Sequence, residues 1–213
     1  IFVKDTKKRV KINLDIIKKF FSSIKKTFND IKQYKQIIRF LLARLVYNDA
    51  LITIFAFGGI YAKEVFDFSF NDIFLFGIIL NITAGLGAFL FGFLDDFIGS
   101  KKTIQITNIG FIFACFIAFV APKISLSVHG ISGESLFWLA GCLIGIFSGP
   151  NQAASRSFIG RLIPRNKENE FYGFFAFSGK ATAFLGPLIF SLIVSITGSL
   201  RWGIFMISIL FFI

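Results

Sequence analysis

The sequence predicts an all-α membrane protein, and three observations support this prediction. Of the 213 residues, 55% are hydrophobic and only 16% are charged, and the mean hydropathy is +0.74; soluble domains carry about 25% charged residues. Apolar stretches long enough to cross a bilayer recur along the chain, and basic residues alternate between the loops that join them. This composition excludes a soluble enzyme, a secreted disulfide scaffold and a disordered chain.

Residues 1–39 are predicted to form a basic amphipathic linker at the cytoplasmic membrane surface. They hold 12 Lys and Arg against three Asp, so +9 of the net charge of +11 lies here. Apolar residues recur at steps of three and four from Ile17 to Ile38, with lysines between them, which is typical of a helix on an anionic leaflet. A mitochondrial presequence and a calmodulin-type target helix are the alternatives; the first fits poorly because Asp is present and Lys outnumbers Arg.

The transmembrane bundle is predicted over residues 40–213. A helix needs about 20 apolar residues to cross a hydrocarbon core about 30 Å thick. Five stretches meet that length: 40–62, 72–94, 103–121, 135–158 and 171–194. A sixth, 202–213, is too short to span. Because the chain does not begin with Met and ends inside an apolar run, we expect a fragment with a truncated last helix.

Loop charges predict the orientation of the bundle. Counted over the loops, 17 Lys and Arg fall on the side of the N-terminal segment and three on the other side. Basic loops stay in the cytoplasm, so the N-terminal segment is predicted to be cytoplasmic. The excess of Lys over Arg, 16 to 7, is typical of an AT-rich genome and favours a bacterial inner membrane.

Two predicted spans carry charged residues, and their presence inside a membrane has to be explained. An ionisable side chain at the bilayer centre costs about 2.5–3.5 kcal/mol on insertion scales. The first span holds Arg44, Asn48 and Asp49, and the fifth holds Lys180. By helix rise, Asp49 and Lys180 each lie about 14 Å deep. We expect them to form an ion pair or the two ends of a polar path; the alternative is that they neutralise one another and fix helix packing.

Three spans contain residues that weaken a helix. Proline removes a backbone hydrogen bond and bends the helix, and glycine favours bending and close approach. Broken helices in several spans are typical of a protein that moves. The predicted kink residues are Gly58 and Gly59, Gly149 and Pro150, and Gly186 and Pro187.

A sharp cytoplasmic turn with a role in gating is predicted after the second span. Gly92 and Gly99 allow the turn, and Lys101 and Lys102 hold it on the cytoplasmic side. We expect Asp96 to accept hydrogen bonds from a neighbouring helix end.

This turn resembles the short cytoplasmic signature of the major facilitator superfamily in its second-half copy. Gly92, Leu94, Asp96, Gly99 and Lys101 match the signature, whereas Phe97 and Ser100 stand where arginines are usual. Residues 40–49, 81–87, 149–157 and 177–187 resemble the vacuole-effluxer-like branch of that superfamily. A fungal autophagy-related amino-acid exporter is the best-known member of this branch.

The resemblance implies the second six-helix half of a twelve-helix permease, made of two inverted three-helix repeats. The missing N-terminal six-helix half would be its partner, and the first and fourth helices would line the pathway. The expected function is secondary-active transport of small polar solutes, with amino acids as candidates and Asp49 as the hypothetical proton-coupling group; a non-transporting scaffold or a membrane-embedded enzyme is the alternative. The predicted pathway residues are Arg44, Asn48, Asp49, Asn81, Gln152, Ser155, Arg156 and Lys180.

The sequence favours a protein without catalytic, metal or cofactor sites. His129 has no neighbouring metal-ligand residues, and Cys115 and Cys142 lie in separate apolar stretches as buried hydrophobes. No phosphate-binding glycine loop is present in the sequence. Because +9 of the net charge of +11 lies in the first segment, the expected partners are the lipid bilayer and a small-molecule substrate rather than nucleic acid.

Overall fold

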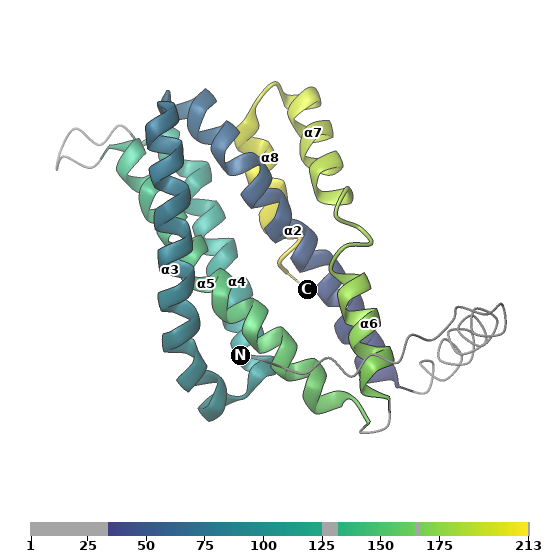
Figure 1. The fold of residues 1–213 in the computed structure, drawn as a ribbon. Coiled ribbons are helices and arrows are strands. Elements are labelled where there is room, and N and C mark those ends of the chain that lie inside the picture. Colours follow the sequence, from purple (N-terminus) through teal and green to yellow (C-terminus); the bar gives the residue numbers. More distant parts are fainter. Residues whose placement is uncertain (1–33, 125–131, 165–166, 213) are drawn as a thin grey trace, which may run out of the picture.

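The computed structural model describes residues 34–124, 132–164 and 167–212, and every regular element within them is helical (Figure 1). The all-α fold predicted from composition is therefore confirmed. Most of the predicted basic linker lies outside the described residues.

The first half of the described chain consists of long helices. Helix α2 covers Lys35–Phe66, α3 covers Phe70–Ile98, and α4 covers Ser100–Val120 and continues into the short 3₁₀ helix η1, Ala121–Lys123. These three segments are long and apolar enough to cross a membrane. Helix α5, Gly133–Leu162, is 30 residues long and carries the polar residues Asn151 and Gln152 in its second half.

The connections between these helices are short and locally capped. At the start of α3, the Ser69 hydroxyl accepts a hydrogen bond from the Asp72 N–H and the Asp72 carboxylate accepts one from the Ser69 N–H, forming a capping box. A single residue, Gly99, joins α3 to α4. Its φ of 84° lies where side chains with a Cβ are strained. The turn is as sharp as the sequence indicates; its role in gating stays a prediction.

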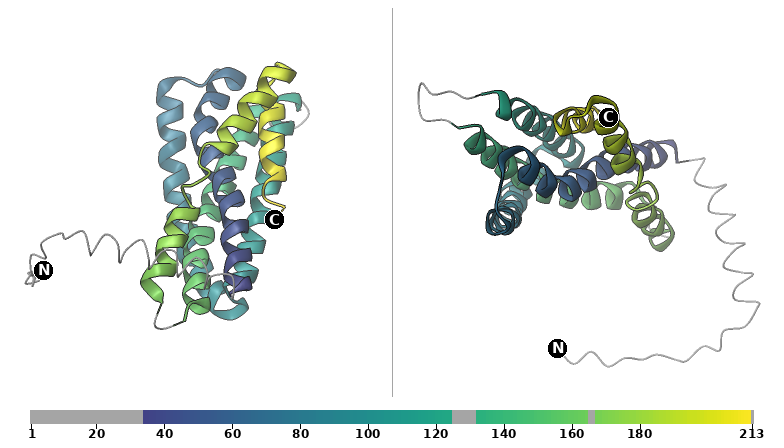
Figure 2. Two further views of the ribbon diagram at one scale, coloured as in Figure 1. Left: turned by 90° about the vertical axis from the view of Figure 1, so that its right-hand side faces the viewer. Right: turned by 90° about the horizontal axis from the view of Figure 1, so that it is seen from above.

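Helices α3, α4 and α5 form one tightly packed group. Helix α5 runs along both of the others (Figures 1 and 2). The approach is close because glycines lie at the contacts: a Cβ on Gly145 would collide with Thr83, and one on Gly87 would collide with the Ile146 backbone. Three glycines spaced four residues apart on α5 therefore serve helix packing: Gly141, Gly145 and Gly149.

The second group of helices surrounds α2. Helices α6 (Glu168–Ser178), α7 (Leu185–Thr197) and α8 (Leu200–Ile209) all contact it, and α8 also packs on α4. Seen from above, α3 and α6 project on the same side of the molecule, with α2 and α5 between them (Figure 2).

The fifth predicted span differs from the structure. Residues 171–194 were expected to be one helix weakened at Gly186 and Pro187, but α6 ends at Ser178 and α7 begins only at Leu185, with turns between them. Gly186 and Pro187 lie in the first turn of α7, where a proline costs no helical hydrogen bond. The break therefore precedes these residues rather than occurring at them.

The other two predicted weak points do not interrupt their helices. Helix α2 continues through Gly58 and Gly59 to Phe66, and α5 continues through Pro150 to Leu162. In α2 the neighbouring turns keep their backbone hydrogen bonds, since glycine lowers helix stability without removing a donor. The only interior helix break among the described residues is the one between α6 and α7.

Candidate functional site

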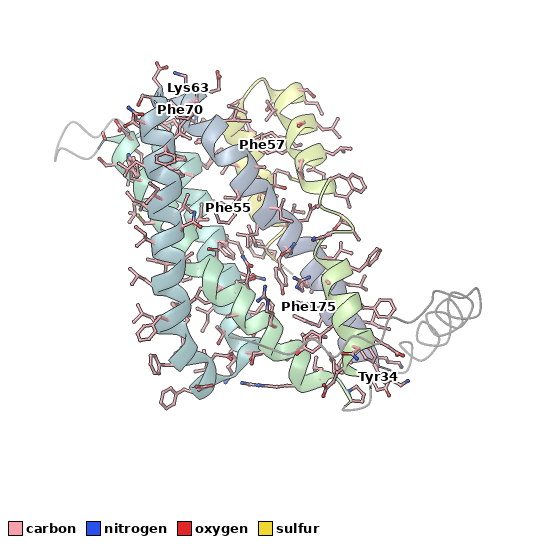
Figure 3. All side chains as sticks on the ribbon, viewed as in Figure 1. Tyr34, Phe55, Phe57, Lys63, Phe70 and Phe175 are labelled. Atoms are coloured by element: carbon pink, nitrogen blue, oxygen red, sulfur yellow. The ribbon has the colours of Figure 1, made fainter. Side chains whose placement is uncertain are left out.

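One polar face of α2 meets the break between α6 and α7. Arg44 Nη1 donates hydrogen bonds to the Phe175 carbonyl oxygen at 2.8 Å and to Ser178 Oγ at 3.0 Å. The guanidinium carbon also lies 3.7 Å from the centre of the Phe175 ring, a cation–π arrangement. Figure 3 shows Phe175 on the side of α6 that faces α2. Arg44 therefore caps the C-terminal end of α6.

The turns between α6 and α7 also form hydrogen bonds to α2. Asn48 Nδ2 donates to the Gly179 carbonyl oxygen at 2.8 Å, and Thr182 Oγ1 donates to the Leu45 carbonyl oxygen at 3.4 Å. Irregular backbone is tolerated at membrane depth only where its polar groups find partners inside the protein. Asn48 supplies one such partner.

Asp49 caps the other side of the break. Its side chain is only 5% exposed, and Oδ2 accepts a hydrogen bond from the Gly186 N–H at 2.6 Å. The second oxygen, Oδ1, is buried and has no hydrogen-bond partner among the described residues. Residue 186 must be glycine for this approach, because a Cβ there would collide with Thr53 Oγ1 and lie 3.1 Å from the Asp49 carbonyl oxygen.

The two caps have the signs that helix dipoles prefer. The C-terminal end of a helix carries partial negative charge and the N-terminal end partial positive charge. The cation Arg44 lies at the end of α6, and the anion Asp49 lies at the start of α7. Their positions on α2 are thus explained by electrostatic and hydrogen-bonding support of a broken helix.

The expected pair of Asp49 and Lys180 does not form. Lys180 is exposed on the turn after α6, whereas the Asp49 carboxylate accepts its hydrogen bond from the Gly186 N–H. The prediction assumed an unbroken helix, in which equal depth would bring the two side chains level. The break removes that geometry, and the Gly186 N–H takes the place of the amine. The alternative, in which the two charges neutralise one another, requires the same pair, so the contacts do not support it either.

A second group of predicted pathway residues lines a groove between α2, α3 and α5. This groove, of about 290 Å³, brings Asn81 of α3 together with Gln152 and Arg156 of α5. Phe55 forms its wall on α2 (Figure 3). We call this the α2–α3–α5 groove. Seven of the eight predicted pathway residues therefore fall into two groups, one at the helix break and one in the groove; the eighth, Ser155, is buried against Tyr47.

A buried polar network on α2, α4 and α5 lies beside the groove. The Tyr47 hydroxyl and Ser155 Oγ are 2.8 Å apart, and Asn151 Nδ2 donates to Thr107 Oγ1 at 2.8 Å and to Asn108 Oδ1 at 3.0 Å. Sequence reasoning included Ser155 and missed the other four. The adjacent polar pair Thr107–Asn108 within an apolar span was the available signal.

At the turn between α3 and α4, the interacting acid is Asp95 rather than Asp96. Ser100 Oγ donates to Asp95 Oδ2 at 3.2 Å, and Arg161 Nη2 lies 3.6 Å from the same oxygen. Asp96 is exposed. Adjacent residues on a helix point about 100° apart, so only Asp95 faces α5. The expectation for Asp96 was therefore wrong by one residue.

Apolar helices, a polar groove and a broken helix supported by buried charged groups define an integral multi-pass membrane protein. The family model described as "Vacuole effluxer Atg22 like" matches residues 2–213, so the chain belongs to this family. The resemblance inferred from the sequence motifs is thereby confirmed.

Individual relatives are similar at modest identity. The chain is 25% identical over 193 residues to "Uncharacterized MFS-type transporter YxiO" of Bacillus subtilis, which covers 91% of this chain and 42% of the relative. It is 26% identical over 207 residues to "Autophagy-related protein 22-2" of Aspergillus niger, covering 95% and 34% respectively. The chain thus spans about two fifths or less of these relatives' length. No solved structure matches it.

Proposed function

We propose that this chain forms part of a secondary-active permease that moves small polar solutes through the α2–α3–α5 groove by alternating access. The observation that carries the proposal is the placement of polar side chains in the walls of a groove between long helices. Asn81 and Gln152 lie near the middle of α3 and α5. Intramembrane polar groups facing a cavity mark substrate pathways by default. Relatives named as a transporter and a vacuole effluxer support the same function.

The break between α6 and α7 is the proposed moving element. Its caps on α2 are a few hydrogen bonds rather than an uninterrupted helix, so α7 can shift relative to α6 without breaking a continuous hydrogen-bond ladder. Discontinuous helices serve this purpose in many transporters. The rest of the pathway would come from a further six-helix half, which we propose as the partner of this chain.

Proton coupling is assigned to Asp49. Its carboxylate is buried, and one oxygen has no hydrogen-bond partner among the described residues. A proton on Oδ1 would neutralise the carboxylate and weaken its attraction to the N-terminal end of α7. Proton binding would therefore loosen the contact between α2 and α7, which couples the proton to movement of the broken helix.

The loop charges and the Lys-rich composition support a proposed location. We propose an integral multi-pass protein with its basic N-terminal segment in the cytoplasm, in a bacterial inner membrane. Amino acids are the first candidates among the solutes because of the family resemblance.

Flux measured in liposomes tests the proposed function. The full-length protein is reconstituted, and counterflow and acid-driven uptake of a labelled amino-acid mixture are followed. A permease gives saturable counterflow with every transported solute, and proton coupling adds acceleration by a pH gradient. A scaffold gives neither. Absence of counterflow for all solutes in folded, correctly inserted protein would contradict the proposal.

A further inference from the structure

The geometry points to an anion-binding subsite on Arg156 in the α2–α3–α5 groove, which takes the carboxylate group of the transported solute. This inference rests on the proposed function and assigns a chemical class to one part of its pathway. The subsite consists of the Arg156 guanidinium, with the Gln152 side-chain amide one helical turn earlier on the same helix.

Arg156 and Gln152 are exposed along the groove and are free to bind a ligand. Within the described residues, neither side chain forms a hydrogen bond or an ion pair. A guanidinium offers five N–H donors in a planar fork that fits a carboxylate through two parallel hydrogen bonds. Arg156 lies six residues before the end of α5 at Leu162, about 9 Å by helix rise. A solute can therefore reach it from the predicted cytoplasmic side.

The other polar groups of the groove are already engaged. Asn81 Nδ2 donates to the Gly77 carbonyl oxygen at 2.8 Å, and Ser148 Oγ donates to the Gly145 carbonyl oxygen at 2.9 Å. Ser148 has no donor left, whereas Asn81 keeps one amide N–H. The groups that can donate to a ligand are thus the Arg156 guanidinium and the side-chain amides of Gln152 and Asn81.

The charges around the subsite favour an anion. The residues that line the groove include one cation and no acidic side chain within the described part of the chain. Arg44 on α2 is committed to the end of α6 by two hydrogen bonds and the Phe175 ring.

The groove also has an apolar wall for the rest of the ligand. Phe55, Leu80 and Ala84 line it opposite the polar residues of α5. A small molecule with a carboxylate at one end and an apolar or neutral body matches this division. A carboxylate could come from such a solute or from an acidic side chain elsewhere in the full-length protein, and the experiment must separate the two sources.

The test compares matched acids and amides in the full-length protein. Lactate with lactamide, and alanine with alaninamide, differ only in whether the carboxylate is present. Counterflow of each solute is measured in liposomes for the wild type, for R156Q and R156K, and for K63Q. Lys63 is exposed at the far end of α2, outside the residues that line the groove, so K63Q is a control for the loss of one positive charge.

Binding of the carboxylate by Arg156 predicts that R156Q weakens transport of the acids and leaves that of the amides nearly unchanged. R156Q raises the half-saturation concentration of lactate and alanine by about 10- to 100-fold, as expected for hydrogen bonds to a charged group, and leaves the amides within about twofold. R156K keeps the charge but not the planar fork, so it falls between the wild type and R156Q. K63Q behaves as the wild type.

Three outcomes overturn the inference. Equal losses for acids and amides would show that Arg156 pairs with an acidic side chain of the protein itself and not with the solute. Unchanged kinetics in R156Q would show that Arg156 does not bind the solute. Faster or tighter transport of the amides by the wild type would exclude a carboxylate. Thermal stabilisation of the purified protein by lactate, lost in R156Q, detects the subsite without flux, so failure of transport is distinguished from failure of the subsite.

Discussion

Arg44 and Asp49 are charged residues within α2, and each side chain forms a hydrogen bond with the backbone of another helix. Arg44 reaches the last turn of α6 and Asp49 reaches the first turn of α7. A buried charged group is costly unless it is paired or hydrogen-bonded, and here the partners are helix ends. Asp49 retains one oxygen without a partner among the described residues, which leaves a place for a proton.

Two substitutions of Asp49 separate its charge from its hydrogen bond. Asn keeps an oxygen that can accept from the Gly186 N–H, whereas Ala leaves that donor without its partner. We expect Asp49→Ala to lower the free energy of unfolding by about 1–3 kcal/mol, and Asp49→Asn to lower it by less. Asp49→Asn should nevertheless abolish the acceleration of uptake by a pH gradient. Melting temperature and acid-driven flux measure the two effects; pH-driven uptake that survives in Asp49→Asn would exclude Asp49 as the coupling group.

Gly186 tests the close approach of α7 to α2. A Cβ at this residue collides with Thr53 Oγ1, and neither helix can relax without weakening the Asp49 cap. We expect Gly186→Ala to destabilise the protein by about 1–3 kcal/mol through overpacking. Gly173→Ala in α6 is the matched control, because no atom lies within 4 Å of its added Cβ. Equal melting temperatures for the two variants would mean that α7 does not lie against α2.

At the scale of helices, sequence reasoning succeeded where local composition decides the structure. The long apolar runs of α2, α3 and α4 predict helices because a bilayer requires every backbone group to be satisfied within the segment. The break after Ser178 was not foreseen, since 171–194 is apolar apart from Lys180 and a few small polar residues. Its support comes from Arg44, Asn48 and Asp49, more than 130 residues earlier.

The close packing of α5 against α3 predicts that a larger side chain at Gly145 destabilises the protein. A Cβ added at Gly145 would lie 2.7 Å from the Leu80 carbonyl oxygen and would also collide with Thr83. Gly145→Val must separate the two helices, so we expect a lower melting temperature and a loss of about 1–3 kcal/mol or more. Gly85→Val on α3 meets open space and serves as the control. A similar effect of both substitutions would indicate that helix propensity rather than close packing is responsible.

For the whole molecule, the contacts between distant segments were harder to predict than the helices themselves. Asn81, Gln152 and Arg156 line one groove, and their role in a pathway stays a prediction. Asp49 and Lys180 do not meet, because the break between α6 and α7 removes the straight helix that would have placed the two side chains level. The polar network around Asn151 was missed because uncharged amides and hydroxyls stand out little in a hydropathy pattern. Contacts between distant segments require the fold.

The orientation of the whole molecule can be tested with single cysteines. Lys63 lies at the end of α2 next to the start of α3, and Lys102 follows the end of α3. A 29-residue helix separates them by about 43 Å, so the two residues should lie on opposite sides of the membrane. In a background with Cys115 and Cys142 replaced by alanine, Lys63→Cys should react with a membrane-impermeant maleimide in intact cells. Lys102→Cys should react only in inside-out vesicles, because basic loops stay in the cytoplasm. The reverse pattern would place the N-terminal segment outside the cytoplasm, and labelling of both residues from one side would show that α3 does not cross the bilayer.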